Sequence, residues 1–125
     1  MREQSSNQTL GKLGESLAVA ELARHGYAII ATRHRTRFGE IDIIAEHRGA
    51  VVFVEVKARR TNRRGSAAEA VTPRKRRRLA AMALDYLAWT GRLDTPCRFD
   101  VVAIDGLASD AMTIRVIEDA WTIDR

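Results

Sequence analysis

The strongest constraint on the fold is a short β-branched and aromatic segment, residues 51–54, that is apolar on both of its faces. Side chains of a β-strand alternate between the two faces of a sheet, so Val52 and Val54 would lie opposite to Val51 and Phe53. A strand that is apolar on both faces belongs inside a sheet that is covered on each side. The segment therefore predicts a central strand of an α/β domain.

Two charged residues follow on this strand. Glu55 and Lys57 are two residues apart, so a strand places both side chains on one face. Residues 41–45 form a second strand-like segment that contains Asp42, and residues 46–50 form the predicted turn between the two strands. A hairpin of these strands would bring Asp42 beside Glu55 and Lys57.

These residue types suit metal-assisted hydrolysis of a phosphodiester. Mg²⁺ binds oxygen ligands, usually one or two carboxylates with water and a substrate phosphate. Asp42 and Glu55 could hold such a cation, and Lys57 could hold the attacking water or stabilise charge on the phosphate. The alternative is a solvated pair of Glu55 and Lys57, which contributes less than about 1 kcal/mol. The apolar context favours a site, because charges at the end of a buried strand are costly unless they are paired or bind a ligand.

A helix is predicted before these strands. Leu10, Leu13 and Leu17 recur at helical spacing and predict a helix over about residues 7–25, after a loose segment, 1–6. Glu15 lies in this helix, in a neighbourhood that is not clearly polar.

A second helix is predicted after them, with Thr72 as N-cap, Pro73 in the first helical position and an end near Trp89. Residues 58–70 show no clean periodicity, and we expect a mobile basic loop there.

The remaining strands are predicted at 27–31, 98–105 and 112–118, the last at an edge of the sheet. The chain of 125 residues is thus expected to form one domain, 1–125, with the order α-β-β-β-α-β-β and a mixed central sheet flanked by helices.

Positive charge is concentrated in one part of the chain. Residues 57–78 hold ten basic side chains and one acidic, Glu69, a net charge of +9, whereas the whole chain carries +5. Such a zone is expected of a polyanion binder, although basic runs are also common as solvated faces. The side chains expected to contact nucleic-acid phosphates are Arg33, Arg35, Arg37, Arg59, Arg63, Arg64, Arg74, Lys75, Arg76, Arg77 and Arg78.

The remaining composition excludes several other classes. No apolar run is long enough to span a bilayer, the first residues lack a signal-peptide core, and Cys97 has no disulfide partner, so we expect a cytoplasmic protein. Clustered cysteines and a phosphate-binding loop motif are absent, which leaves structural zinc and nucleotide hydrolysis unsupported. Trp89 and Trp121 are expected to pack, and an aromatic content of 6% disfavours a platform that stacks single-stranded bases.

An ordered set of motifs carries a family resemblance. It consists of Gly14-Glu15, Gly26-Tyr27, Gly39-Glu40-Ile41-Asp42, the segment 52–59, Lys75, and Arg98-Phe99-Asp100-Val101-Val102. This set resembles the bacterial YraN-type family, which is similar to archaeal Holliday-junction resolvases of the restriction-endonuclease-like superfamily.

The resemblance implies a restriction-endonuclease-like fold, with Asp42 and Glu55 as ligands of Mg²⁺ or Mn²⁺, Lys57 as the catalytic lysine and Glu15 as a supplementary catalytic and metal-binding residue. We therefore expect a metal-dependent nuclease that acts on structured or branched DNA. One alternative is a nucleic-acid-binding module on the same fold that does not cut, and another is an adaptor whose basic face meets an acidic protein. A four-way junction as substrate would call for a homodimer.

Overall fold

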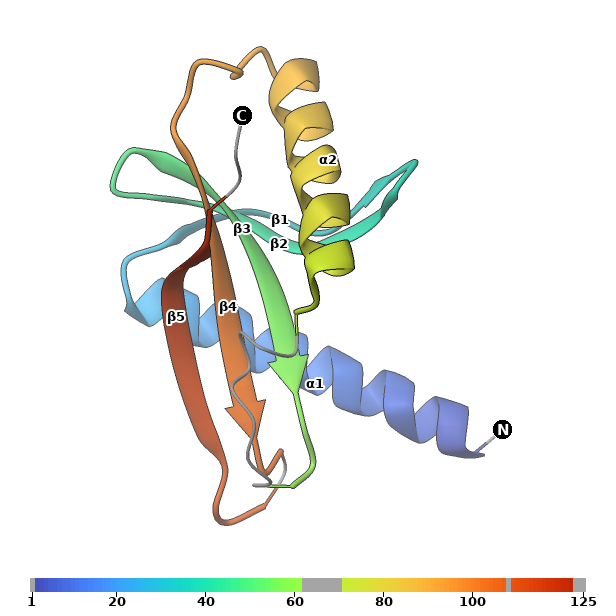
Figure 1. Ribbon diagram of the computed structural model, residues 1–125. Coiled ribbons are helices and arrows are strands. Elements are labelled where there is room, and N and C mark those ends of the chain that lie inside the picture. The colour runs from blue at the N-terminus through green and yellow to red at the C-terminus, as the bar shows by residue number, and fades with distance from the viewer. Residues whose placement is uncertain (1, 62–70, 108, 123–125) are drawn as a thin grey trace.

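The computed structural model describes residues 2–61, 71–107 and 109–122, and it describes their side chains from Gly11 onward. Two helices and five strands follow one another in the predicted order (Figure 1). They are α1 (Arg2–Arg24), β1 (Ala28–Thr36), β2 (Gly39–His47), β3 (Ala50–Ala58), α2 (Pro73–Trp89), β4 (Cys97–Asp105) and β5 (Thr113–Trp121).

The strands form one mixed sheet in the order β1-β2-β3-β4-β5. Neighbouring strands are antiparallel except β3 and β4, which run parallel with Glu55 opposite Val101. A parallel pair needs a crossover connection, and α2 lies within it. The prediction of β5 at an edge is confirmed, and the chain is a mixed α/β domain with a five-stranded sheet and two helices.

The two helices cover opposite faces of the sheet, so β3 is buried on both sides as its sequence predicts. On one face Leu22 of α1 packs in a core cluster with Val52 and Val54, and on the other Leu87 of α2 packs with Phe53. In Figure 1, α1 passes behind the strands. No helix in the described part of the chain combines the length and apolar composition of a membrane span.

Several predicted boundaries are wrong. Helix α1 begins at Arg2, so segment 2–6 is helical, and β1 continues as far as Thr36. The turn between β2 and β3 contains only Arg48 and Gly49, with φ values of 51° and 79°. Positive φ at both residues fits the tight two-residue turn that matches the twist of a hairpin.

The predicted basic loop, 58–70, is fixed where it leaves the sheet. Ala58 is the last residue of β3, and the Arg59 amide donates a hydrogen bond of 2.8 Å to the Ile104 carbonyl. The Leu107 amide donates to the Arg59 carbonyl at 2.8 Å. Residues 58–61 therefore continue along β4, and positions 62–70 lie outside the described residues.

The sheet divides between β2 and β3. Their pairing ends at Ile43 and Val54, whereas β1 and β2 remain paired to the Thr36–Gly39 turn and β3 stays paired with β4. In Figure 1 the β1–β2 hairpin projects past α2, away from the lower ends of the other strands. We call the point where β2 and β3 separate, next to Asp42 and Glu55, the sheet fork.

Candidate active site at the sheet fork

Asp42 lies at the sheet fork and completes the hydrogen bonding there. Its Oδ2 atom accepts a hydrogen bond of 2.8 Å from the backbone amide of Val56. Because β2 no longer pairs with β3 at this point, the carboxylate takes the place of a strand carbonyl. The hairpin register thus fixes the orientation of the Asp42 side chain.

Glu55 lies next to Asp42 on the face of the sheet covered by α2. Its side chain is only 8% exposed, and Oε1 lies 2.7 Å from Nζ of Lys75. Lys75 is in the first turn of α2, and its backbone amide donates to the Oγ1 atom of Thr72 at 3.2 Å. The predicted Thr72–Pro73 helix start is confirmed, and it determines where Lys75 leaves the helix.

The charges of these side chains perturb one another. Burial and the neighbouring charge of Glu55 raise the pKa of Asp42 from 3.8 to about 7, against opposing effects of the Val56 amide and Lys75. Burial and the adjacent Lys75 lower the pKa of Lys57. Burial lowers the pKa of Lys75, but its hydrogen bonds to Glu55 and Lys57 and the charges of Glu55 and Asp42 together outweigh this, so the net change is a rise. The two acids and two lysines form one electrostatic unit, which we call the acid–lysine cluster.

Glu15 approaches the sheet fork from the other face. Helix α1 passes close to β3 at Gly14, where an added Cβ would lie 3.1 Å from that of Ala58. The Oε2 atom of Glu15 accepts a hydrogen bond of 2.7 Å from Nε of Arg33, whose φ of 51° breaks the regular alternation along β1. Glu15 and Arg33 line a cleft of about 590 Å³ together with Gly11, Lys12, Glu40, Asp42, Val56 and Ala58.

The site residues fit a divalent cation through two carboxylates. Among the residues that the structure describes, no three His, Cys, Asp or Glu side chains gather closely enough to bind one metal ion, and Glu15 lines the same cleft as Asp42. A role of Glu15 in metal binding stays a prediction. Mg²⁺ commonly takes only one or two carboxylates and completes its shell with water and phosphate. The repulsion that raises the pKa of Asp42 would be relieved by a cation. Such a cation would share Glu55 with Lys75.

The basic side chains predicted to bind phosphates divide into two groups. Some are held by the protein itself: Arg35 lies 3.6 Å from Glu40, and Arg76 Nε donates to the Val71 carbonyl at 2.9 Å. Others are exposed, namely Arg37, Arg74, Arg77 and Arg78. Arg59 is partly buried, and Arg63 and Arg64 lie outside the described residues.

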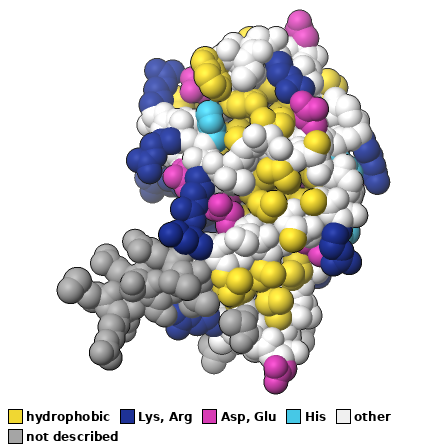
Figure 2. Space-filling model, turned by 180° about the vertical axis from the view of Figure 1, so that it is seen from behind, with side chains coloured by type: hydrophobic (Ala, Val, Ile, Leu, Met, Phe, Trp, Pro, Cys, Tyr) yellow, Lys and Arg dark blue, Asp and Glu magenta, His cyan; other side chains and the backbone are white. Residues whose placement is uncertain are grey.

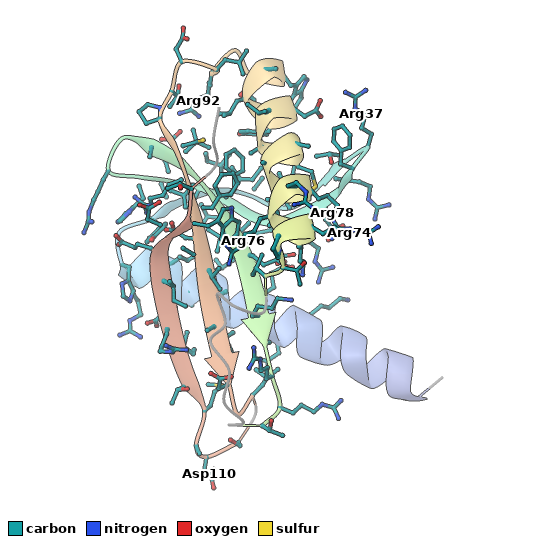
Figure 3. All side chains as sticks on the ribbon, in the orientation of Figure 1. Arg37, Arg74, Arg76, Arg78, Arg92 and Asp110 are labelled. Atoms are coloured by element: carbon teal, nitrogen blue, oxygen red, sulfur yellow. The ribbon has the colours of Figure 1, made fainter. Side chains whose placement is uncertain are left out.

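The exposed basic side chains lie toward the hairpin and the margins of the molecule. Figure 3 shows Arg37 at the turn of the β1–β2 hairpin and Arg74 and Arg78 on the side of α2 toward which this hairpin projects. Viewed from behind, Lys and Arg side chains lie mainly along the edges, and hydrophobic side chains occupy the middle (Figure 2).

A second polar cluster lies on the face of the sheet covered by α1, where Arg98 and Asp100 are paired with Val52 and Val54. Asp100 is fully buried and accepts hydrogen bonds from Tyr27 Oη at 2.6 Å, Arg98 Nε at 2.9 Å and the Asp119 amide at 2.9 Å. His47 stacks on Tyr27 with ring centroids 3.9 Å apart, and its Nδ1 accepts from Arg98 at 2.7 Å. Because these groups satisfy one another, this cluster joins the α1–β1 turn to β2, β4 and β5 and has a structural role.

Sequence reasoning placed Lys75 among the phosphate contacts and missed its ion pair with Glu55. The available signal is weak: Lys75 is one of five consecutive basic residues, 74–78, and only the capping pattern distinguishes its position.

The fold and the acid–lysine cluster define a small mixed α/β domain with a carboxylate pair at a split in its sheet. Residues 14–104 match the model of an uncharacterised protein family, UPF0102, and the chain belongs to this family. A UPF0102 protein of Symbiobacterium thermophilum is 46% identical over 115 residues, which cover 92% of this chain and 98% of the relative. A relative from Geobacter sulfurreducens is also 46% identical, over 94% of this chain and 91% of the relative.

Proposed function

We propose that this protein is a Mg²⁺- or Mn²⁺-dependent nuclease of the restriction-endonuclease-like superfamily that hydrolyses phosphodiester bonds in structured or branched DNA. The observation that carries the proposal is the acid–lysine cluster. Asp42 and Glu55 lie beside each other at the sheet fork, with the pKa of Asp42 raised to about 7, and two lysines lie against them. A costly arrangement of like charges is more typical of a ligand site than of a purely structural contact.

Each member of the cluster has a distinct role in this reaction. Asp42 and Glu55 would hold the divalent cation, which supplies Lewis acidity toward a phosphoryl oxygen and lowers the pKa of bound water. Lys57, whose pKa is lowered by burial and by Lys75, would position the attacking water and assist its deprotonation. Lys75 would move its positive charge from Glu55 to the phosphate.

The surrounding charges support a nucleic acid as substrate. Arg74 belongs to the same first turn of α2 as Lys75, and Arg77 and Arg78 are exposed on the next turn. Basic residues at a helix N-terminus oppose the helix dipole, a local cost that phosphate binding would offset. Helix α2 would therefore direct the DNA backbone toward the acid–lysine cluster.

Cleavage of a substrate panel tests the proposal. The purified protein is incubated with duplex, single-stranded, flap and four-way DNA in Mg²⁺, Mn²⁺ or chelator. We expect metal-dependent cleavage of at least one substrate. Asp42→Ala should abolish that cleavage while DNA affinity changes by less than about threefold, because Asp42 is not a phosphate contact. Asp85→Ala, which removes an exposed carboxylate of α2, is the matched control.

A non-cutting nucleic-acid-binding module is the second candidate. The ion pair of Lys75 with Glu55 favours it, because the lysine already neutralises one of the two acids. Titration with Mn²⁺ separates the two functions: a nuclease binds the ion through Asp42 and Glu55, and the Asp42→Ala variant loses that binding. Absence of cleavage on every substrate with both metals would refute the nuclease and leave the binding module.

A further inference from the structure

The turn of the β1–β2 hairpin presents an aromatic ring from a fixed backbone. Its two residues are Arg37 and Phe38, and the Thr36 hydroxyl accepts from the Phe38 amide at 3.0 Å and donates to the Gly39 carbonyl at 2.9 Å. Gly39, with φ of 136°, lies against α2, where an added Cβ would meet Met82 Sδ at 3.6 Å. The turn is thus held by its own hydroxyl and by the helix.

The Phe38 ring at this turn is open to solvent. It is 40% exposed, and the Arg37 guanidinium lies 4.8 Å from its centroid. A planar guanidinium beside an aromatic ring offers two surfaces on which nucleic-acid bases can stack.

Trp89 provides a second exposed ring. It is 75% exposed, and its indole stacks on His34 of β1 with centroids 5.9 Å apart. Trp121, in contrast, is 7% exposed and stacks on Phe99. The prediction that both tryptophans pack is therefore confirmed for Trp121 and wrong for Trp89.

The two exposed rings belong to one edge of the molecule. Trp89 rests on His34, which lies near the end of β1 and precedes Phe38 by four residues. Arg74 and Arg78 line the same side of α2 (Figure 3), and in the described part of the chain no carboxylate lies within ion-pair distance of either. Exposed aromatic rings can stack on unpaired bases, and arginines without a carboxylate partner can bind phosphates. The surface therefore complements single-stranded DNA.

We propose that the β1–β2 hairpin turn and the adjoining side of α2 bind an unpaired segment of DNA, with bases stacked on Phe38 and Trp89. Bases within a duplex are stacked on one another, so their faces are not accessible to these rings. This surface therefore selects substrates that have a single-stranded portion next to the cleavage site. The inference rests on the proposed function for the nature of the ligand, and it narrows the substrate class to DNA with an unpaired stretch.

Binding in chelator, where no cleavage occurs, tests this inference. Affinities are measured for an oligothymidylate and for a blunt duplex of the same length. Phe38→Ala should weaken single-strand binding by about 5- to 160-fold, the range for loss of one stacked base. Duplex binding should change by less than about twofold. Phe38→Tyr, which keeps the ring, should bind as the wild type does, and so should Leu93→Ala, which removes a 51% exposed aliphatic side chain and no aromatic ring.

Tryptophan emission gives an independent measurement. Oligothymidylate should quench the wild-type emission through Trp89, and Trp89→Phe should lose most of this quenching, because Trp121 is buried. Equal effects of Phe38→Ala and Leu93→Ala, or an equal loss on duplex and single strand, would overturn the inference. A selective Phe38 effect without any cleavage would refute only the nuclease, whereas cleavage without a selective Phe38 effect would refute only the stacking surface.

Discussion

Replacing Asp42 by asparagine should make the metal-free protein more stable at pH 8, although most substitutions at partly buried positions destabilise a protein. Burial and the charge of Glu55 raise the pKa of folded Asp42 to about 7, whereas the unfolded chain has a pKa near 3.8. Between these values the folded state binds more protons than the unfolded state, so stability falls as the pH rises. The substituted amide carries no charge and still has a side-chain oxygen that can accept from the Val56 amide.

The size of the effect follows from the pKa. The increase in the pKa of Asp42 from 3.8 to about 7 corresponds to about 4 kcal/mol of folding stability that is lost above pH 7. Asp42 and Glu55 form a coupled pair that shares one repulsion, so we expect Asp42→Asn to recover about 2–4 kcal/mol at pH 8. Near pH 4 the wild-type carboxyl group is protonated in the folded state, and the gain should vanish.

Urea unfolding followed by circular dichroism, in chelator at pH 4 and pH 8, measures this difference. Asp85→Asn, an exposed change on α2, should alter stability by less than about 0.5 kcal/mol at either pH. Saturating Mn²⁺ should stabilise the wild type, by about 2.7 kcal/mol at one hundred times the dissociation constant, and should stabilise Asp42→Asn much less. A variant that is less stable than the wild type at pH 8, or that gains equally at both pH values, would refute the electrostatic reasoning.

Two further substitutions test the ionic contacts. Lys75→Met removes the cation beside the 8% exposed Glu55 and should lower stability in chelator by about 1–3 kcal/mol, with recovery in Mn²⁺, as thermal melting would show. Asp100→Ala leaves Arg98 without its buried partner and should lower the free energy of unfolding by about 3–5 kcal/mol in urea titrations, whether or not Mn²⁺ is present.

Controls separate these effects from nonspecific loss of stability. Arg77→Met removes an exposed charge of α2 close in the chain to Lys75 and should change stability by less than about 0.5 kcal/mol. Equal melting temperatures of Lys75→Met and Arg77→Met in chelator would contradict a stabilising role of the ion pair between Lys75 and Glu55. Rescue of Asp100→Ala by Mn²⁺ would contradict the structural role of its cluster.

Local sequence patterns determined much of the fold. The run Val51–Val54, apolar on both faces, predicted a central strand, and the Thr72–Pro73 pair marked the start of α2. Asp42 and Glu55 could be placed side by side because a short turn joins their strands, and hairpin register depends on nearby residues. These features depend on the alternation of side chains along a strand, on helix capping and on turn length. Each of these involves only a few neighbouring residues and can be recognised in the sequence.

The partner of each charged side chain could not be predicted from the sequence in the same way. The resemblance implies a metal-binding role for Glu15, which stays a prediction, and it gives no sign that packing of α1 against β3 at Gly14 brings Glu15 to Arg33. Nor could the sequence show that Lys75 turns toward Glu55.

Local patterns in the chain are enough to predict the order of helices and strands, the buried central strand and the proximity of Asp42 to Glu55. Folding in three dimensions adds that β2 and β3 separate at these acids, that Lys75 neutralises Glu55 and that Trp89 remains exposed. Local patterns miss these features because burial and ion pairing depend on which distant segments meet in space. Residues separated by 20 positions, such as Glu55 and Lys75, acquire their partners only when the helix docks on the sheet.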